Sequence, residues 1–244
     1  MAEFCIKIAG FTAAVTSLFD STKDYCRAYL TGDAPDFFIR VTPEDLAYEQ
    51  DFLDREAREE GLRRRKFTDP FLERSAIQRA VAENLISRGV LLLHGSTVAV
   101  DGEAFLFTAK CGTGKSTHTR LYREVFGPRA RMVNDDKPFL RFTEHGVLAC
   151  GAPWSGKHGL DSNITVPLRG ICVLKRGEEN HIESAAAEEV LPMLKSQSNP
   201  PRREEDLPKW EELLQTLAET VPLWQMACTK DPSAAEISHR AMTK

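Results

Sequence analysis

The alternation of hydrophobic and polar positions along the chain predicts short strands and amphipathic helices in an order typical of an α/β protein. Predicted strands cover residues 4–9, 37–41, 90–94, 96–100, 103–108, 131–133, 139–142, 147–150, 171–174, 181–183 and 221–228. Predicted helices cover residues 16–30, 70–88, 115–126, 185–194, 209–220 and the chain from 232 onward, and a further helix begins at Thr42. We expect a small N-terminal α+β portion, residues 1–66, packed on a core domain, residues 67–244.

Residues 51–66 form a segment of dense alternating charge that ends in the basic run 63–66. One interpretation is a solvated helix face or loop, and the other is an anion-binding or subunit surface. The sequence leaves both open.

The dipeptide Asp101-Gly102 lies between two predicted strands and predicts a tight β-hairpin. In an ordinary βαβ unit, the strand that enters a phosphate loop follows a helix. Here the hairpin requires the preceding strand to run antiparallel to the entering one. We therefore expect an α/β fold with a mixed parallel and antiparallel sheet and flanking helices.

A candidate phosphate-binding loop joins the strand at 103–108 to the helix at 115–126. Its glycines allow backbone N–H groups to point at phosphate oxygens, and the N-terminus of the helix favours negative charge. In the Walker A pattern, Lys115 reaches the β- and γ-phosphates and the Ser116 hydroxyl holds Mg²⁺. The candidate nucleotide-binding residues are Ala109, Lys110, Cys111, Gly112, Thr113, Gly114, Lys115, Ser116 and Thr117.

The loop departs from the full pattern G-x-x-x-x-G-K-[ST] at its first position, where this chain has Ala109. Alanine restricts the backbone if that turn needs a positive φ. The sequence therefore leaves two functions open: phosphotransfer, or ATP binding by a regulatory or assembly protein that transfers nothing. A GTPase is not favoured, because the chain has no Asn-Lys-x-Asp motif.

Asp135 and Asp136 follow a predicted strand, which places them at the same edge of a parallel sheet as the phosphate loop. One carboxylate is expected to hold Mg²⁺ and the other to accept the proton of a hydroxyl acceptor, and the sequence does not say which does which. Without the phosphate loop, two such acids are also compatible with a solvated turn. Lys137 is either an ion-pair partner or a phosphate contact.

The order Leu93-His94-Gly95, Asp-Gly hairpin, phosphate loop and Asp-Asp pair resembles the catalytic domain of HPr kinase/phosphorylase, a phosphoenolpyruvate-carboxykinase-like P-loop kinase. The resemblance implies ATP and Mg²⁺ as cofactors and places His94 near the phosphates. It assigns phosphate and metal binding to Lys115 and Ser116, and metal and acid–base roles to Asp135 and Asp136. The residues before the phosphate loop do not read as the separate N-terminal domain of the full-length enzyme, and the protein-substrate signature finds no match in the sequence. We therefore expect a short bacterial relative with an unidentified hydroxyl acceptor other than HPr, and a homo-oligomer is possible by analogy.

Residues 151–163 form a second unusual loop, rich in turn-forming residues yet carrying Trp154, Lys157, His158 and Asp161. Such loops often present side chains over a site. Lys157 is a candidate to neutralise transferring phosphate, and His158 or Asp161 to contact the acceptor. The alternative is an ordered surface loop held in place by Trp154.

Composition mainly argues against certain partners and locations. The formal net charge of -4 gives no global basic footprint, so nucleic acid is not an expected partner. No apolar run approaches the roughly 20 residues that span a bilayer, and the N-terminus does not read as a secretory signal. The six cysteines form no C-x-x-C pair, which favours reduced thiols and a cytoplasmic location.

Overall fold

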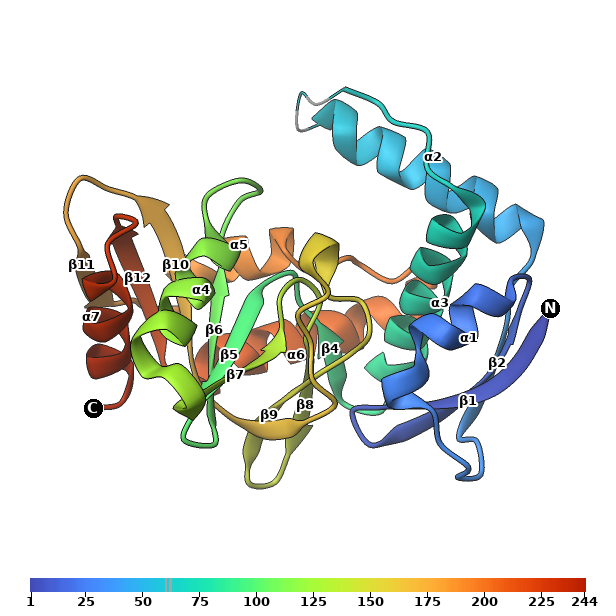
Figure 1. Cartoon of the computed structure of the whole chain (residues 1–244), viewed down its shortest axis with the longest axis horizontal. Helices are drawn as coiled ribbons and strands as arrows, with labels where there is room; N and C mark the ends of the chain where they lie inside the picture. Colours follow the sequence, from blue (N-terminus) through green and yellow to red (C-terminus); the bar gives the residue numbers. More distant parts are fainter. Residues whose placement is uncertain (60, 62) are drawn as a thin grey trace. The chain divides into compact units, whose positions relative to one another are not determined.

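The chain, shown in Figure 1 as a computed structural model, forms two compact units, Met1–Asn84 and Leu85–Lys244. The structure describes residues 1–59, 61 and 63–244. The sequence-based division after residue 66 assigns the helix that begins at Asp69 to the core domain, whereas most of this helix belongs to the first unit. Two residues of the charged segment 51–66, Glu60 and Leu62, lie outside the described residues.

In its described residues, the first unit contains a small mixed sheet and three α-helices. Its elements are β1 Ala2–Ile8, β2 Phe11–Ser17, α1 Asp20–Tyr25, β3 Phe37–Arg40, α2 Pro43–Glu59 and α3 Asp69–Ile86. Strand β2 runs antiparallel to β1 and parallel to β3. The helix expected over residues 16–30 is wrong, because residues up to Ser17 extend β2 in register with β1 and the helix begins only at Asp20.

Buried acidic side chains organise the helices of this unit. Glu73 is fully buried and accepts hydrogen bonds from the Phe19 backbone N–H and the Thr22 hydroxyl, at the start of α1. Glu49 forms a buried ion pair with Arg79, which links α2 to α3. Removing one partner of a buried pair leaves the other charge unpaired and out of contact with water, which is destabilising. These contacts therefore favour one packing of the helices.

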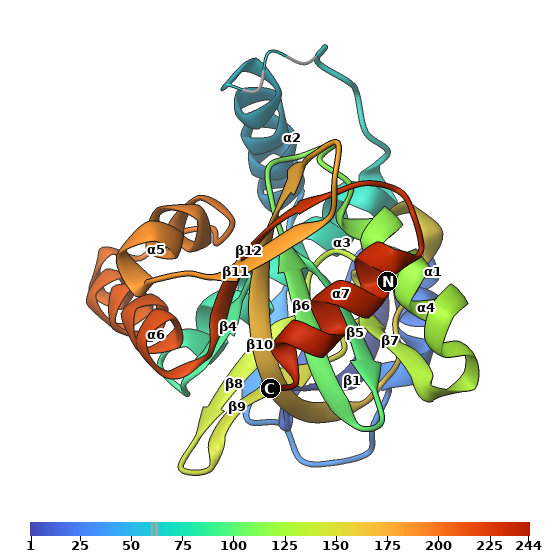
Figure 2. The same cartoon turned by 90° about the vertical axis from the view of Figure 1, so that its left-hand side faces the viewer.

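The second unit is built on a mixed sheet with the strand order β4-β8-β9-β10-β6-β5-β7, extended by β12 and β11 beside β10. Its strands are β4 Val90–Leu92, β5 Ser96–Val100, β6 Glu103–Thr108, β7 Ala130–Asn134, β8 Phe139–Thr143, β9 Gly146–Cys150, β10 Thr165–Arg176, β11 His181–Ser184 and β12 Leu223–Cys228. Its helices are α4 Lys115–Phe126, α5 Ala187–Ser196, α6 Leu207–Thr220 and α7 Ser233–Met242. Figure 2 shows α4 and α7 on one side of the central strands and α5 and α6 on the other. The expected α/β fold with a mixed sheet and flanking helices is confirmed.

The Asp-Gly hairpin forms as the sequence predicts. Asp101 and Gly102 both have positive φ, 52° and 88°, and Val100 pairs with Glu103 across the turn. Strand β5 also pairs antiparallel with β7 on its other side. Because β6 and β7 are both antiparallel to β5, they run in the same direction and end at the same edge of the sheet.

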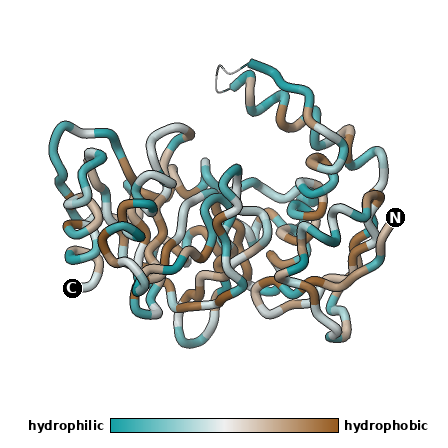
Figure 3. Tube along the Cα trace, in the orientation of Figure 1, coloured by the Kyte–Doolittle hydropathy of each residue, from teal (hydrophilic) through white to brown (hydrophobic). Residues whose placement is uncertain are grey.

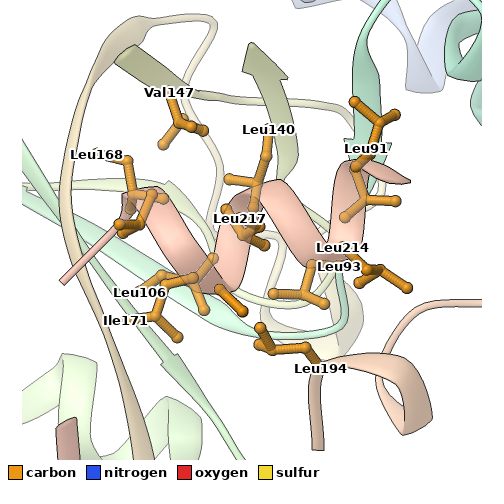
Figure 4. Packing of buried hydrophobic residues seen from close by; sticks show 14 of the residues in the cluster. Leu91, Leu93, Leu106, Leu140, Val147, Leu168, Ile171, Leu194, Leu214 and Leu217 are labelled. Atoms are coloured by element: carbon orange, nitrogen blue, oxygen red, sulfur yellow. The ribbon is translucent and has the colours of Figure 1, made fainter. Parts of the chain in front are cut away.

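Alternate residues of the central strands pack into different hydrophobic layers. On β6, Leu106 joins a cluster that includes α5 and α6, whereas Phe105 and Phe107 join a cluster that includes α4 and α7. Figure 4 shows the first cluster around Leu106, Ile171 and Leu217. Figure 3 shows the hydrophobic residues concentrated in the strands and hydrophilic ones in the connecting loops. A sheet covered on both faces holds its strand ends rigidly, which positions the loops at its edge.

Among the described residues, no helix combines the length and the apolar character needed to cross a bilayer.

Candidate functional site

The candidate phosphate loop leaves the sheet at the end of β6 and enters α4 through Gly114. Gly112 and Gly114 have positive φ values of 72° and 126°, which residues with a side chain rarely adopt. Lys115, the first residue of α4, is largely buried, and its Nζ donates a hydrogen bond to the Ala109 carbonyl at 3.0 Å. The lysine therefore closes the loop on itself, while Ser116 is exposed at the first turn of the helix.

Ala109 fits its position without strain. Among the described residues other than glycine, only Ala9 and Asp101 have positive φ, so the backbone at Ala109 does not require glycine. The residue is buried, and its methyl group belongs to the hydrophobic cluster that contains Phe107 and Leu121. The departure from the Walker A pattern therefore does not distort the turn.

The acidic turn after β7 is organised by Asn134, whose role the sequence analysis missed. This side chain is fully buried, and its Oδ1 accepts hydrogen bonds from the backbone N–H groups of Asp136 at 2.8 Å and Lys137 at 2.6 Å. Its Nδ2 donates to the carbonyls of Ala152 at 2.8 Å and Trp154 at 3.2 Å. One amide thus ties the acidic turn to the second loop. The available signal was a polar residue at the buried end of a strand, directly before the acids.

Asp135 is buried and connected to α4 through two hydroxyl groups. The Ser96 hydroxyl donates to Asp135 Oδ1 at 2.6 Å, and Ser96 Oγ lies 2.7 Å from Thr119 Oγ1. Thr119 is also within hydrogen-bond distance of the Ser116 carbonyl, at 3.3 Å. This chain of contacts holds the Asp135 carboxylate in fixed relation to the first turn of α4.

Asp136 is more exposed than Asp135 and forms a pair with His94. Its Oδ1 lies 3.0 Å from His94 Nε2, and both side chains are about one-third exposed, at 33% and 28%. Burial lowers the pKa of His94 below its usual value, against the opposing effect of Asp136. Burial alone would raise the pKa of Asp136, but the hydrogen bond from His94 and the positive charges of Lys137 and Lys115 together lower it. The carboxylate is therefore ionised at neutral pH, within electrostatic reach of the phosphate-loop lysine.

The second loop returns to the end of β7. Asn134 and Asp161 form a β-bridge, and the Ser155 hydroxyl donates to Asp161 Oδ1 at 2.6 Å. Gly151 lies so close to the neighbouring chain that an added Cβ would stand 1.8 Å from the Ser162 carbonyl oxygen. Backbone contact of this kind fixes both ends of the loop.

Between its fixed ends, the loop forms the short 3-10 helix Gly156–His158. Gly156 has a φ of 70°, and an added Cβ would lie 3.2 Å from the Cβ of Asp136. Lys157 and His158, which follow directly, are exposed, and it is the backbone of Gly156 that lies against the acidic turn. Trp154 is instead buried, with its ring centre 6.2 Å from that of Phe139.

The residues expected to hold Mg²⁺ supply donors of suitable chemistry. Within the described part of the chain, no three His, Cys, Asp or Glu side chains cluster as a metal site. Mg²⁺ in phosphate-binding sites typically needs only one or two carboxylates in addition to the substrate phosphates. Ser116 offers an exposed hydroxyl, and Ser96 engages only Oδ1 of Asp135 among the hydrogen bonds of the described residues. These two residues therefore fit the cation.

Comparisons with known proteins give a distant structural likeness. No family model and no curated protein matches the chain. Among solved structures, the chain is similar to the Hpr(Ser) kinase/phosphatase from Coxiella burnetii, with 11% sequence identity and a TM-score of 0.37. The match covers 62% of this chain and 97% of the other. The likeness concerns a distant fold relationship alone.

Proposed function

We propose that the chain binds Mg-ATP at residues 109–117 and transfers the γ-phosphate to a hydroxyl acceptor. The observation that carries this proposal is the 3.0 Å pair of His94 and Asp136 beside the candidate phosphate loop, where the hydroxyl of Thr108, the residue before Ala109, donates to the His94 carbonyl at 2.9 Å. The hydrogen-bond chain from Asp135 to α4 supports the same assignment. A phosphate loop, a metal-binding carboxylate and a partly exposed carboxylate are the parts that phosphoryl transfer requires.

Asp136 is assigned as the group that accepts the acceptor's proton. It is ionised at neutral pH, partly exposed, and oriented by His94 Nε2 and by its backbone bond to Asn134. A carboxylate of lowered pKa is a weak base, but a loose phosphoryl-transfer transition state places little demand on base strength. Its main contribution is therefore to orient the attacking hydroxyl.

Asp135 and Ser116 are assigned as the residues that hold Mg²⁺. The cation neutralises charge on the β- and γ-phosphate oxygens when bound. Lys115 and the N-terminus of α4 stabilise the same charge from the protein side. Asp135 suits this role better than proton transfer, because it is almost fully buried and held by Ser96.

The test combines γ-labelled ATP, a panel of hydroxyl acceptors and two acid variants. We expect Asp136→Asn to slow transfer by roughly a hundredfold or more while it keeps nucleotide binding, measured as a thermal shift. Asp135→Asn should weaken the Mg²⁺-dependent part of that shift. The matched control is Glu103→Gln, an exposed acid at the opposite end of β6.

Full transfer by the Asp136→Asn protein would refute its assigned role. Labelled free phosphate as the sole product with every acceptor would instead favour a nucleotide-dependent regulatory or assembly protein.

A further inference from the structure

We propose that the acceptor carries an anionic group of its own, a phosphate or a carboxylate, and that Lys137 and Lys157 bind it beside Asp136. This inference rests on the proposed kinase function and specifies its second substrate. It concerns two lysines on different loops, whose neighbours Asp136 and Gly156 the fold brings into contact.

Lys137 is fixed in the acidic turn. Its backbone N–H donates to Asn134 Oδ1 at 2.6 Å, and its side chain is half-buried. Its charge lowers the pKa of both His94 and Asp136. Because Lys137 directly follows Asp136 in this turn, its side chain leaves the backbone next to the carboxylate that orients the acceptor.

Lys157 reaches the same place from the second loop. It follows Gly156, the residue whose added Cβ would lie 3.2 Å from Asp136 Cβ. The Asn134 amide and the Ser155–Asp161 hydrogen bond hold the loop on either side of this lysine. The backbone is thus fixed while the exposed side chain remains free to turn toward a ligand.

Lys137 acts on Asp136 through its charge, but no direct ion pair engages Lys137 or Lys157 within the described part of the chain. Neither Lys137 nor Lys157 forms a salt bridge there. Other lysines of the protein do form such pairs, including Lys7, Lys195 and Lys209. Lysines without a direct ion pair favour an anionic ligand, because complementary charge attracts that ligand and disfavours cationic ones.

The nucleotide does not require these two lysines. The phosphate-loop amides, Lys115 and Mg²⁺ already provide for its phosphates. If Lys157 served the transferred phosphate instead, its loss would lower kcat with every acceptor. If it binds the acceptor's own anion, its loss raises KM for charged acceptors alone.

The experiment compares neutral polyols and sugars with related compounds that carry a phosphate or a carboxylate. Glycerol is compared with glycerol 3-phosphate and with glycerate, and glucose with glucose 6-phosphate and gluconate. Binding to the full chain with Mg²⁺ and a non-hydrolysable ATP analogue is measured by calorimetry, and turnover is measured with ATP. The variants are Lys157→Gln, Lys137→Gln and Lys157→Arg, with Lys209→Gln on α6 as the matched control.

We expect the charged member of at least one pair to bind more tightly than its neutral counterpart. Lys157→Gln and Lys137→Gln should each weaken that binding roughly tenfold, Lys157→Arg should restore most of it, and Lys209→Gln should change nothing. Binding of the charged probe should also weaken as ionic strength rises. Comparison of the phosphate-bearing probes with the carboxylate-bearing probes identifies which anion the site prefers.

No preference for any charged probe would overturn this inference, as would a preference that both lysine variants leave intact. An equal loss of kcat with neutral and charged acceptors would also overturn it. Each of these outcomes leaves nucleotide binding in place, whereas absence of Mg-ATP binding would overturn the proposed function itself.

Discussion

A buried histidine on α4, the helix that follows the phosphate loop, makes the stability of the second unit depend on pH. His118 is 2% exposed, and its ring packs 4.4 Å from that of Phe107. Its Nε2 lies 3.0 Å from the Ser238 hydroxyl, which links α4 to α7. Burial lowers the pKa of His118 from 6.5 to about 4.

The sign follows from which state binds the proton. Between pH 6.5 and about 4 the unfolded chain protonates this histidine and the folded chain does not. The free energy of unfolding therefore falls as pH falls through that window. The pKa difference limits the loss to roughly 3.4 kcal/mol, and at pH 5 it amounts to about 2 kcal/mol relative to pH 7.5.

Urea unfolding of the wild-type protein and of His118→Gln at pH 7.5 and pH 5 measures this effect. The variant should lose about 2 kcal/mol less than the wild type between the two pH values, because glutamine does not titrate. His145→Gln, in an exposed turn, is the control and should behave like the wild type. Equal pH dependence in wild type and His118→Gln would refute the reasoning, as would an NMR titration midpoint near 6.5 for His118 in the folded protein.

Three further substitutions test the site. Gly151→Ala should destabilise the protein by roughly 2 kcal/mol or more in urea unfolding, because its Cβ would meet the Ser162 carbonyl at 1.8 Å; unchanged stability would contradict this close approach. Ala109→Gly should leave ATP affinity unchanged and cost about 0.4–1 kcal/mol of stability, whereas tighter ATP binding would show that Ala109 impairs the loop. Asn134→Ala should slow phosphotransfer at least roughly tenfold while nucleotide thermal shifts persist, since the acidic turn loses its anchor; unaltered transfer would remove Asn134 from the site.

The sequence predicted those parts of the fold that depend on local chemistry. The Asp101-Gly102 dipeptide specifies a hairpin because both residues tolerate positive φ, and the structure has that hairpin. The helix predicted over residues 16–30 begins too early. Its apolar positions fit a helix, but Thr16 and Ser17 pair with β1 and belong to β2. Strand pairing is a long-range contact that local pattern does not contain.

The supports of the candidate site were the hardest part to predict. The loop and the acid pair are recognisable by motif, but the contacts that hold them come from residues distant in sequence. Ser96 reaches Asp135, and Asn134 reaches Trp154, only after the strands have assembled. Nothing in the sequence around Gly156 indicates that it lies against Asp136, and this contact is seen only in the structure.

The strand between β6 and β7 has a consequence for the dimensions of the candidate site. Strand β5 pairs with β6 on one side and with β7 on the other. The ends of β6 and β7 are therefore separated by two inter-strand spacings, or about 9–10 Å. Backbone hydrogen bonding sets this span, so neither loop length nor side-chain choice at the edge can alter it. The hairpin strand β5 therefore determines the distance between the candidate phosphate loop and the acidic turn.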